Sequence, residues 1–216
     1  VDFNADIGAN HLGKWDDDRV RNVRVMAERG GLHIGIHTLS AVNIAEFSPF
    51  MAGAADEYLN ANIALGQRIG ADWITVHGGF HFTTEEDARR NASIERLKRA
   101  TDFAESRGQR LLLENLNFEP DDAEVHYLAH TIEECHWYFD EIQSEAFGWA
   151  FTANHANLVP EGIDGFLDEF GISRIGCVRI ADNDGTVEVH KIPGDGDIEF
   201  ASMFRRLENS GYQSHY

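Results

Sequence analysis

Residues 109–117 of the chain, Gln-Arg-Leu-Leu-Leu-Glu-Asn-Leu-Asn, decide its fold. A short apolar run, Leu111–Leu113, ends in a carboxylate at Glu114 and an amide at Asn115. A run of this length that follows a helix ending at Gly108 is typical of a buried parallel strand. A charge at the end of a buried strand is costly without a partner. We therefore expect Glu114 to face a cation or a metal ion.

Two other stretches have the same design, because each is an apolar run that ends in a histidine. Residues 32–37 read LHIGIH and end at His37, and residues 73–77 read WITVH and end at His77. The carboxyl ends of neighbouring parallel strands lie on one rim, so His37, His77 and Glu114 are expected to meet there. Two imidazoles and a carboxylate are the composition of a metal site on the C-terminal face of a β/α barrel.

The rest of the chain alternates strands with helices. Further strands are expected at 148–151 and 175–180, and a brief one within residues 1–6. Helices are expected at 16–29, after a loop that contains Pro49 and up to Gly70, and from a Thr83–Glu86 capping box to Gly108. Others are expected after a Thr131–Glu134 capping box, around 163–170 and around 200–207.

This alternation fits two architectures, a (β/α)8 barrel and an open doubly wound sheet. No glycine-rich phosphate loop follows the first strand, and polar residues end nearly every strand, which favours the barrel. We predict an α/β protein with one TIM-barrel domain over residues 1–216. Because only six strands are found and a barrel needs eight, we expect terminal strands to be missing at one or both ends.

The composition is strongly acidic. The 216 residues include 37 Asp and Glu against 18 Lys and Arg, which gives a net charge of −19, and only three of the basic residues are lysines. This indicates either adaptation to high salt, a halophilic character, or simply an acidic protein. Both interpretations make nucleic acid an unlikely partner, because phosphate contacts require clustered cations.

The location of the protein is predicted from its cysteines and its hydropathy. Cys135 and Cys177 fall in a predicted helix and a predicted strand, where buried thiols are more typical than a disulfide. No apolar run approaches the ~20 residues of a membrane span, and no signal peptide is visible. We therefore expect a cytoplasmic protein with no membrane partner.

Five motifs occur in order at barrel spacing: GLHIGIH, ADWITVHGG, LLLEN, FTANHANLVPEG and RIADNDGTVEVHKIPGDG. Through them, residues from about Gly31 to Tyr212 resemble the xylose-isomerase-like TIM-barrel superfamily. That superfamily includes sugar isomerases and epimerases and the apurinic/apyrimidinic endonucleases. The last motif matches the acid-x-His-x3-Gly-x-Gly loop of the family through Glu188 and His190.

The resemblance implies metal ligands, but this chain departs from the pattern. Isomerases of the family hold a divalent ion with Glu, Asp, His and Glu on the fifth to eighth strands. Glu114 matches the first position, Thr152 and Arg179 stand at the next two, and the fourth would lie beyond Tyr216. Arg179 brings a fixed positive charge to a ligand position.

The endonuclease branch implies a different assignment of the same side chains. In it, one zinc site would correspond to His37, His77 and Glu114, and another to His155, Glu188 and His190. Either assignment implies Mn or Zn as the cofactor. Histidines that simply form hydrogen bonds on the rim are the alternative to a metal or substrate role.

We therefore expect an isomerase or epimerase that acts on a small sugar or sugar phosphate. Glu114 would serve as base or metal ligand, His155 and His190, beside Glu188, would orient hydroxyls, and Arg179 would hold an anionic group. Two alternatives stay open: a zinc-dependent endonuclease-like phosphodiesterase acting on abasic DNA, and a catalytically inactive barrel that only binds. A homo-oligomer is compatible with all three. The residues Phe80-His81-Phe82 either stack on a sugar ring or cover the core.

Overall fold

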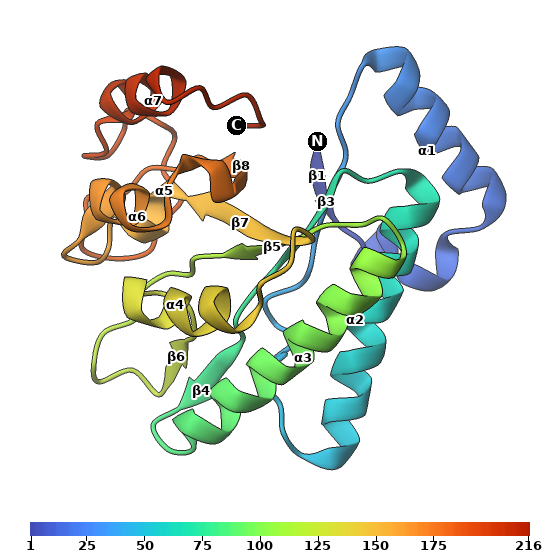
Figure 1. Cartoon of the computed structure of the whole chain (residues 1–216), viewed down its shortest axis with the longest axis horizontal. Coiled ribbons are helices and arrows are strands. Elements are labelled where there is room, and N and C mark those ends of the chain that lie inside the picture. The colour runs from blue at the N-terminus through green and yellow to red at the C-terminus, as the bar shows by residue number, and fades with distance from the viewer.

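The computed structural model describes residues 1–216 and contains one large parallel sheet (Figure 1). Neighbouring strands of this sheet pair in the order in which they occur in the chain, and every pairing is parallel. The six strands are β1 (Asp2–Asn4), β2 (Gly35–His37), β3 (Trp73–Val76), β5 (Leu111–Glu114), β7 (Phe147–Thr152) and β8 (Ile175–Arg179). This is the strand set predicted from the sequence.

The sheet is an incomplete TIM barrel, as predicted. Strands β1 and β8 are its two edges, because neither has a second partner strand in the sheet. The register between β7 and β8 shifts at Trp149 and Ala150, which bends the sheet next to its β8 edge. All six carboxyl ends point toward the same rim, where the side chains singled out in the sequence lie.

Helices follow most strands and lie on the outside of the sheet (Figure 1). They are α1 (Asp17–Gly30), α2 (Pro49–Ile69), α3 (Glu86–Ser106), α4 (Ile132–Glu141), the short α5 (Ala153–Ala156), α6 (Gly162–Phe170) and α7 (Phe200–Asn209). Short 3-10 turns occupy Gly8–Asn10, Leu12–Lys14 and Ile172–Arg174. None of the helices combines the length and apolar character that crossing a membrane requires.

Of the two predicted capping boxes, only the threonine half of one is present, because the carboxylate of Glu134 accepts from the amide of His130 rather than from that of Thr131, and the other was a wrong prediction. Thr131 Oγ1 accepts a hydrogen bond of 3.1 Å from the amide of Glu134 and so caps α4. Helix α3 instead begins at Glu86, after Glu85 with a φ of 68°, and no side chain caps it. A short strand ends at Phe82, so the chain turns sharply through Glu85 and Thr83 is too far from the helix start to cap it.

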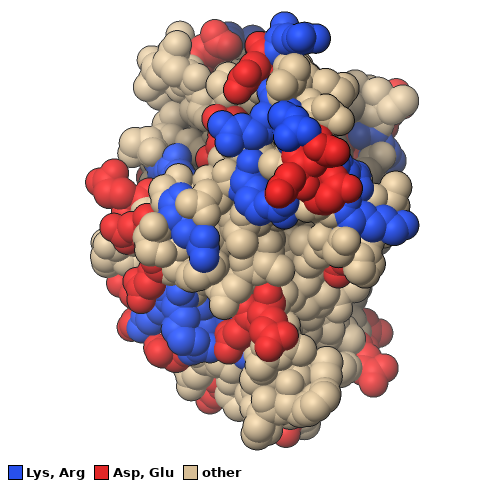
Figure 2. All heavy atoms as spheres, turned by 90° about the vertical axis from the view of Figure 1, so that its right-hand side faces the viewer, with Lys and Arg blue, Asp and Glu red and all other residues tan.

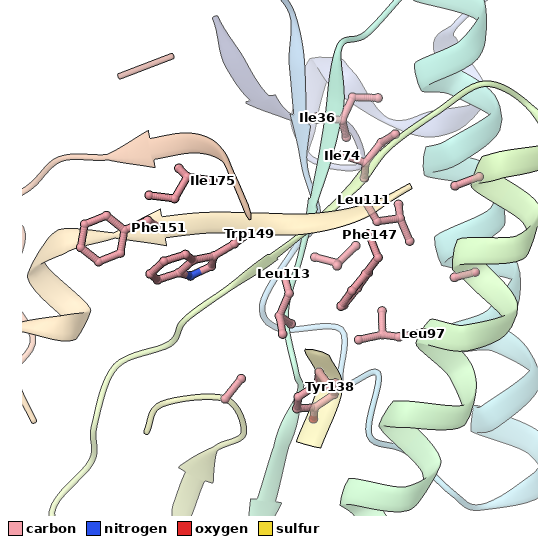
Figure 3. Packing of buried hydrophobic residues seen from close by; sticks show 14 of the residues in the cluster. Ile36, Ile74, Leu97, Leu111, Leu113, Tyr138, Phe147, Trp149, Phe151 and Ile175 are labelled. Carbon is pink, nitrogen blue, oxygen red and sulfur yellow. The ribbon is translucent and has the colours of Figure 1, made fainter. Parts of the chain in front are cut away.

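The main core lies between the outer face of the sheet and the helices. Figure 3 shows Leu111 and Leu113 of β5 within this core, together with Leu97 of α3 and Tyr138 of α4. Because side chains alternate along a strand, Leu112 faces the other way and belongs to a small inner cluster with Trp73, Ala150 and Cys177. Cys135 and Cys177 are both buried free thiols, as predicted.

The inner face of the sheet is tightly packed around a glycine in β2. A Cβ atom on Gly35 would lie 2.3 Å from the indole ring of Trp73 on the neighbouring strand. The absence of a side chain at Gly35 therefore lets Trp73 lie flat across the inside of the sheet.

A second, smaller sheet was not predicted. Strand β4 (Phe80–Phe82) pairs antiparallel with β6 (Val125–Tyr127), and Phe80 lies opposite Tyr127. The two strands are only three residues long and sit in the loops that follow β3 and β5, so no periodic pattern marks them. Their pairing joins two loops of the rim into one element.

Candidate functional site

Glu114 lies at the centre of the rim, where three strands bring their carboxyl ends together. His37 ends β2, and its Nε2 lies 3.0 Å from Glu114 Oε2. His77 follows β3, and its Nε2 lies 3.2 Å from the same oxygen. One ligand atom from each of the three side chains falls within 4.8 Å of the others. The structure thus brings together the histidine pair and the carboxylate that the sequence pattern singled out.

The other oxygen of Glu114 faces β7 and β8. Thr152 Oγ1 donates a hydrogen bond of 2.6 Å to Oε1, and Arg179 Nε lies 3.4 Å from it. Burial raises the pKa of Glu114, but the hydrogen bonds from His37 and His77 and the charge of Arg179 outweigh it and hold this pKa well below its ordinary value. Glu114 is therefore an ionised carboxylate with both oxygens engaged.

Arg179 links this carboxylate to the opposite edge of the sheet. Its Nη1 forms an ion pair with Asp2 of β1, while its Nε faces Glu114. Because Arg179 ends β8 and Asp2 begins β1, this contact connects the two edge strands. Asp2 was not among the site residues predicted from the sequence. The sequence indicated it only as a carboxylate in the brief first strand, because its partner Arg179 lies 177 positions away.

Asn115 holds the residues around Glu114 in place. Its Oδ1 accepts hydrogen bonds from Trp149 Nε1 at 3.0 Å and from the amide of Thr152 at 2.9 Å. Its Nδ2 donates to the carbonyl of Thr152, and its own carbonyl lies 2.8 Å from His155 Nδ1. One buried amide thus fixes the end of β7 and the orientation of the His155 ring.

A second group of three side chains lies beyond His155. Glu188 Oε1 lies 2.7 Å from His190 Nε2 and 3.4 Å from His155 Nε2, and it accepts a hydrogen bond of 2.9 Å from Asn154. Glu188 Oε2 is buried and has no hydrogen-bond partner. Burial lowers the pKa of His155, but the neighbouring carboxylates of Glu188 and Glu114 outweigh it, so this pKa is raised.

The loop that carries Glu188 and His190 is anchored by a buried carboxylate. Asp182 Oδ2 accepts hydrogen bonds from the amides of Gly194 and Gly196 at 2.8 and 2.9 Å. Its Oδ1 accepts a third from the amide of Ile198. Asp182 and Asn183 are both buried. They close the loop on itself and place its acid-x-His pair beside His155.

Both groups line one cavity of about 980 Å³. Arg179 and Thr152 also line it, and Tyr127 of β6 forms part of its wall. A volume of this size accommodates a small polar ligand with room for water. The cavity combines hydrogen-bond donors, acceptors and charges of both signs, which suits a substrate that carries many hydroxyls.

The donor set of the first group fits a divalent cation. Burial lowers the pKa of His77 in spite of its contact with Glu114, which favours the neutral imidazole that binds metals. Two imidazoles and a carboxylate suit Zn²⁺ or Mn²⁺. Only Oε2 of Glu114 is in a position to bind the cation, because Oε1 already contacts Thr152 and Arg179.

The second group fits a cation for a different reason. The buried, unpartnered Oε2 of Glu188 leaves a carboxylate oxygen unsatisfied, which a cation or a ligand hydroxyl would correct. His155, Glu188 and His190 bring one ligand atom each to within 4.8 Å of the others. They are the three residues that the resemblance to the endonuclease branch assigned to a second zinc site.

Comparison with known proteins agrees with this geometry. A sequence model of the xylose isomerase-like TIM barrel matches residues 2–216. The crystal structure of a D-tagatose 3-epimerase-like protein superposes with a TM-score of 0.84 at 21% identity, over 99% of this chain and 79% of that one. D-psicose 3-epimerase from Clostridium cellulolyticum H10 gives a TM-score of 0.79 at 17% identity, over 99% and 72% of the two chains.

The chain is also similar in sequence to a protein that is named as an endonuclease. A probable endonuclease 4 of Staphylococcus saprophyticus is 26% identical over 174 residues, which cover 77% of this chain. The match spans 57% of the length of that relative.

Proposed function

The chain belongs to the xylose isomerase-like TIM barrel family, and from this premise we propose that it acts as a sugar or sugar-phosphate isomerase or epimerase. The observation that carries the proposal is the ionised Glu114, held between two histidines and an arginine in a large polar cavity. The structural neighbours that are sugar 3-epimerases support the same substrate class.

The proposed reaction moves a proton on a carbon next to a carbonyl. The C–H bond breaks, and its proton passes to the carboxylate of Glu188, whose Oε2 has no hydrogen-bond partner and which lines the cavity. The electron pair of the bond shifts toward the carbonyl oxygen, and return of a proton from Glu188 to carbon gives the isomer or epimer. A divalent ion, Mn²⁺ or Zn²⁺, held by His37, His77 and Glu114 would polarise the carbonyl and hydroxyl oxygens of the substrate. In this proposal Glu114 is a ligand and charge anchor rather than the base, because both of its oxygens are already engaged.

The remaining side chains orient the substrate. The ring of His155 is fixed through Asn115, so its Nε2 faces Glu188 and the cavity, where it exchanges a proton with a substrate hydroxyl. The carboxylate of Glu188 accepts hydrogen bonds from neighbouring hydroxyls of the substrate, and the imidazole of His190 donates hydrogen bonds to them or accepts hydrogen bonds from them. Arg179 holds an anionic or carbonyl oxygen through the N–H groups that Asp2 and Glu114 leave free.

Hydrogen exchange tests this proposal directly. The protein, supplied with Mn²⁺ or Zn²⁺, is incubated with D-tagatose, D-psicose or their phosphates in D₂O, and deuterium on carbon is followed by NMR. We expect incorporation by the wild type and its loss in Glu114→Gln. The matched control is Glu134→Gln, a buried carboxylate that pairs with His130 and does not line the cavity. No exchange with any of these sugars by the wild type would refute the proposal for this substrate class.

A second candidate function is a phosphodiesterase that cleaves abasic DNA. It is favoured by the second group of His155, Glu188 and His190 and by the similarity to a probable endonuclease 4. The net charge of −19 works against it, because the DNA backbone is anionic. Cleavage of an abasic duplex by the wild type, lost in Glu188→Gln, would establish it in place of the isomerase. If neither assay detects turnover, a barrel that binds without catalysis is the remaining account.

We also propose that the protein works in the cytoplasm of a salt-adapted cell. Two buried free thiols fit a reducing compartment, and the excess of acidic over basic residues fits high ionic strength. Added KCl should then raise the urea midpoint of unfolding by screening the repulsion between carboxylates. A midpoint that falls with KCl would contradict the salt adaptation.

A further inference from the structure

The loop that follows β8 holds a buried carboxylate among its own backbone amides. Asp182 Oδ2 accepts hydrogen bonds from the amides of Gly194 and Gly196, at 2.8 and 2.9 Å. Its Oδ1 accepts a third, of 3.2 Å, from the amide of Ile198. Amides that converge at the C-terminal rim of a β/α barrel are a common way of holding the phosphate group of a substrate. Here the converging amides instead hold a side chain of the same protein.

The backbone leaves no room beside this carboxylate for a second anion. A Cβ atom on Gly196 would lie 2.3 Å from Asp182 Oδ1 and 2.4 Å from the carbonyl oxygen of Asn183. Another glycine of the loop, Gly185, donates its amide to Asn183 Oδ1 at 3.0 Å. The amides of all three glycines in residues 182–199 are therefore bonded to side chains of the loop itself.

The charge of this loop also disfavours a phosphate group. Residues 182–199 include six aspartates and glutamates but only one lysine and no arginine. The Nζ of that lysine, Lys191, lies 3.3 Å from a carboxylate oxygen of Asp184. A phosphate group is bound through donors and positive charge. The loop thus offers it no unpaired cation and many carboxylates.

The cations of the cavity are also paired within the chain. Arg179 is the only arginine or lysine that lines the cavity, and it contacts both Asp2 and Glu114. The two imidazoles of the second group contact the carboxylate of Glu188. Half of the 18 lysines and arginines lie instead on α1 and α3. Figure 2 shows such side chains, mixed with carboxylates, on the side of the molecule that carries α1 in Figure 1.

We propose that Asp182 is a specificity-determining residue, which takes the place of a substrate phosphate and so restricts the cavity to unphosphorylated sugars. The inference rests on the proposed function, because it narrows the substrate class from sugars and sugar phosphates to free sugars. A phosphate group would meet carboxylates on the loop and amides that are already occupied, and like charges at close range disfavour binding. Arg179 then meets the carbonyl oxygen of a free sugar.

Hydrogen exchange with two matched compounds tests the substrate class. The wild type, supplied with Mn²⁺, is incubated in D₂O with D-psicose or with the phosphate ester of its terminal hydroxyl, and deuterium on carbon is followed by NMR. We expect kcat/KM to be higher for the free sugar by roughly tenfold or more, because the ester adds charge of the same sign as the loop. A phosphate ester that exchanges as fast as the free sugar, or faster, would overturn the proposal.

A second experiment tests the role of Asp182 without turnover. Asp182→Ala leaves three amides without an acceptor and a void with the shape of a carboxylate, which a formate ion fits. We expect sodium formate to raise the thermal midpoint of this variant, compared with sodium chloride at equal ionic strength, and to leave that of the wild type unchanged.

The matched control for this variant is Asp184→Ala, which removes the same charge from the same loop. Asp184 is exposed, and its carboxylate accepts hydrogen bonds only from Thr186 and Lys191. Formate that fails to stabilise Asp182→Ala, or that stabilises Asp184→Ala equally, would contradict the role of Asp182.

Failure of the inference and failure of the proposed function are distinguishable. A wild type that exchanges neither compound refutes the proposed function. Equilibrium dialysis of the wild type with radiolabelled inorganic phosphate, without added metal, then decides the inference. Saturable binding of phosphate would overturn it, and no binding is the expected result. The same dialysis decides the inference if Asp182→Ala does not fold, because it requires the wild type alone.

Discussion

Removing the hydroxyl of Thr152 should destabilise the protein measurably. Thr152 Oγ1 donates to the buried, ionised Glu114 over 2.6 Å, and Thr152→Val removes this donor while keeping the shape of the side chain. A hydrogen bond to a charged group is worth about 1.5–3 kcal/mol. Glu114 keeps its contacts with His37, His77 and Arg179 in the variant. The loss should therefore stay below the ~3–5 kcal/mol of breaking a buried ion pair.

Thr75→Val provides the matched control for this measurement. Thr75 is a buried threonine in the same sheet, but its hydroxyl has no hydrogen-bond partner. Replacing an unsatisfied buried hydroxyl with a methyl group should be neutral or stabilising. Urea unfolding at neutral pH without added metal measures the free energy of unfolding of both variants. Equal stability losses in Thr152→Val and Thr75→Val would refute the reasoning, because the loss would then come from the change of side chain rather than from the contact with Glu114.

Two further predictions concern packing and the anchored loop. Gly35→Ala should lower the free energy of unfolding by about 1–3 kcal/mol through overpacking, because the new Cβ would lie 2.3 Å from Trp73. In the control Gly53→Ala in α2, the new Cβ meets nothing within 4 Å, so this variant should be more stable than the wild type. Urea midpoints that fall equally in both variants would contradict this. The pKa of Asp182 is lowered because amide hydrogen bonds from Gly194, Gly196 and Ile198 outweigh the opposing effect of burial. Its contribution to stability is therefore present above its ordinary pKa of ~4 and lost as the pH falls through the lowered value. The stability gap between wild type and Asp182→Asn should be constant near neutrality and shrink below about pH 4; a gap that widens in acid would contradict the assignment.

The parts of the fold that follow from local pattern were predictable. Strands β2, β3 and β5 lie in apolar runs, and a polar residue at the carboxyl end of each run is a local feature that places His37, His77 and Glu114 on one rim. Gly31 and Gly70 end α1 and α2 in the left-handed conformation. These ends were predictable because glycine adopts this conformation without steric cost.

The contacts that span long sequence separations were not predictable. Glu114 was expected to face a cation or a metal ion, and Arg179 does lie beside it, yet Arg179 also pairs with Asp2 from the other edge of the sheet. Pairing of β4 with β6 depends on two loops meeting in space. The burial of Arg89 in α3 could not be predicted either, because an arginine in a helix is ordinarily exposed.

The central claim is that Glu114, with His37 and His77, holds a divalent ion in the cavity. Elemental analysis tests it most directly, on protein purified without chelators in high salt. We expect about one Mn or Zn per chain in the wild type and in Glu134→Ala, and a loss of that ion in Glu114→Ala. Metal that is absent from the wild type, or that stays bound in Glu114→Ala, would contradict the account.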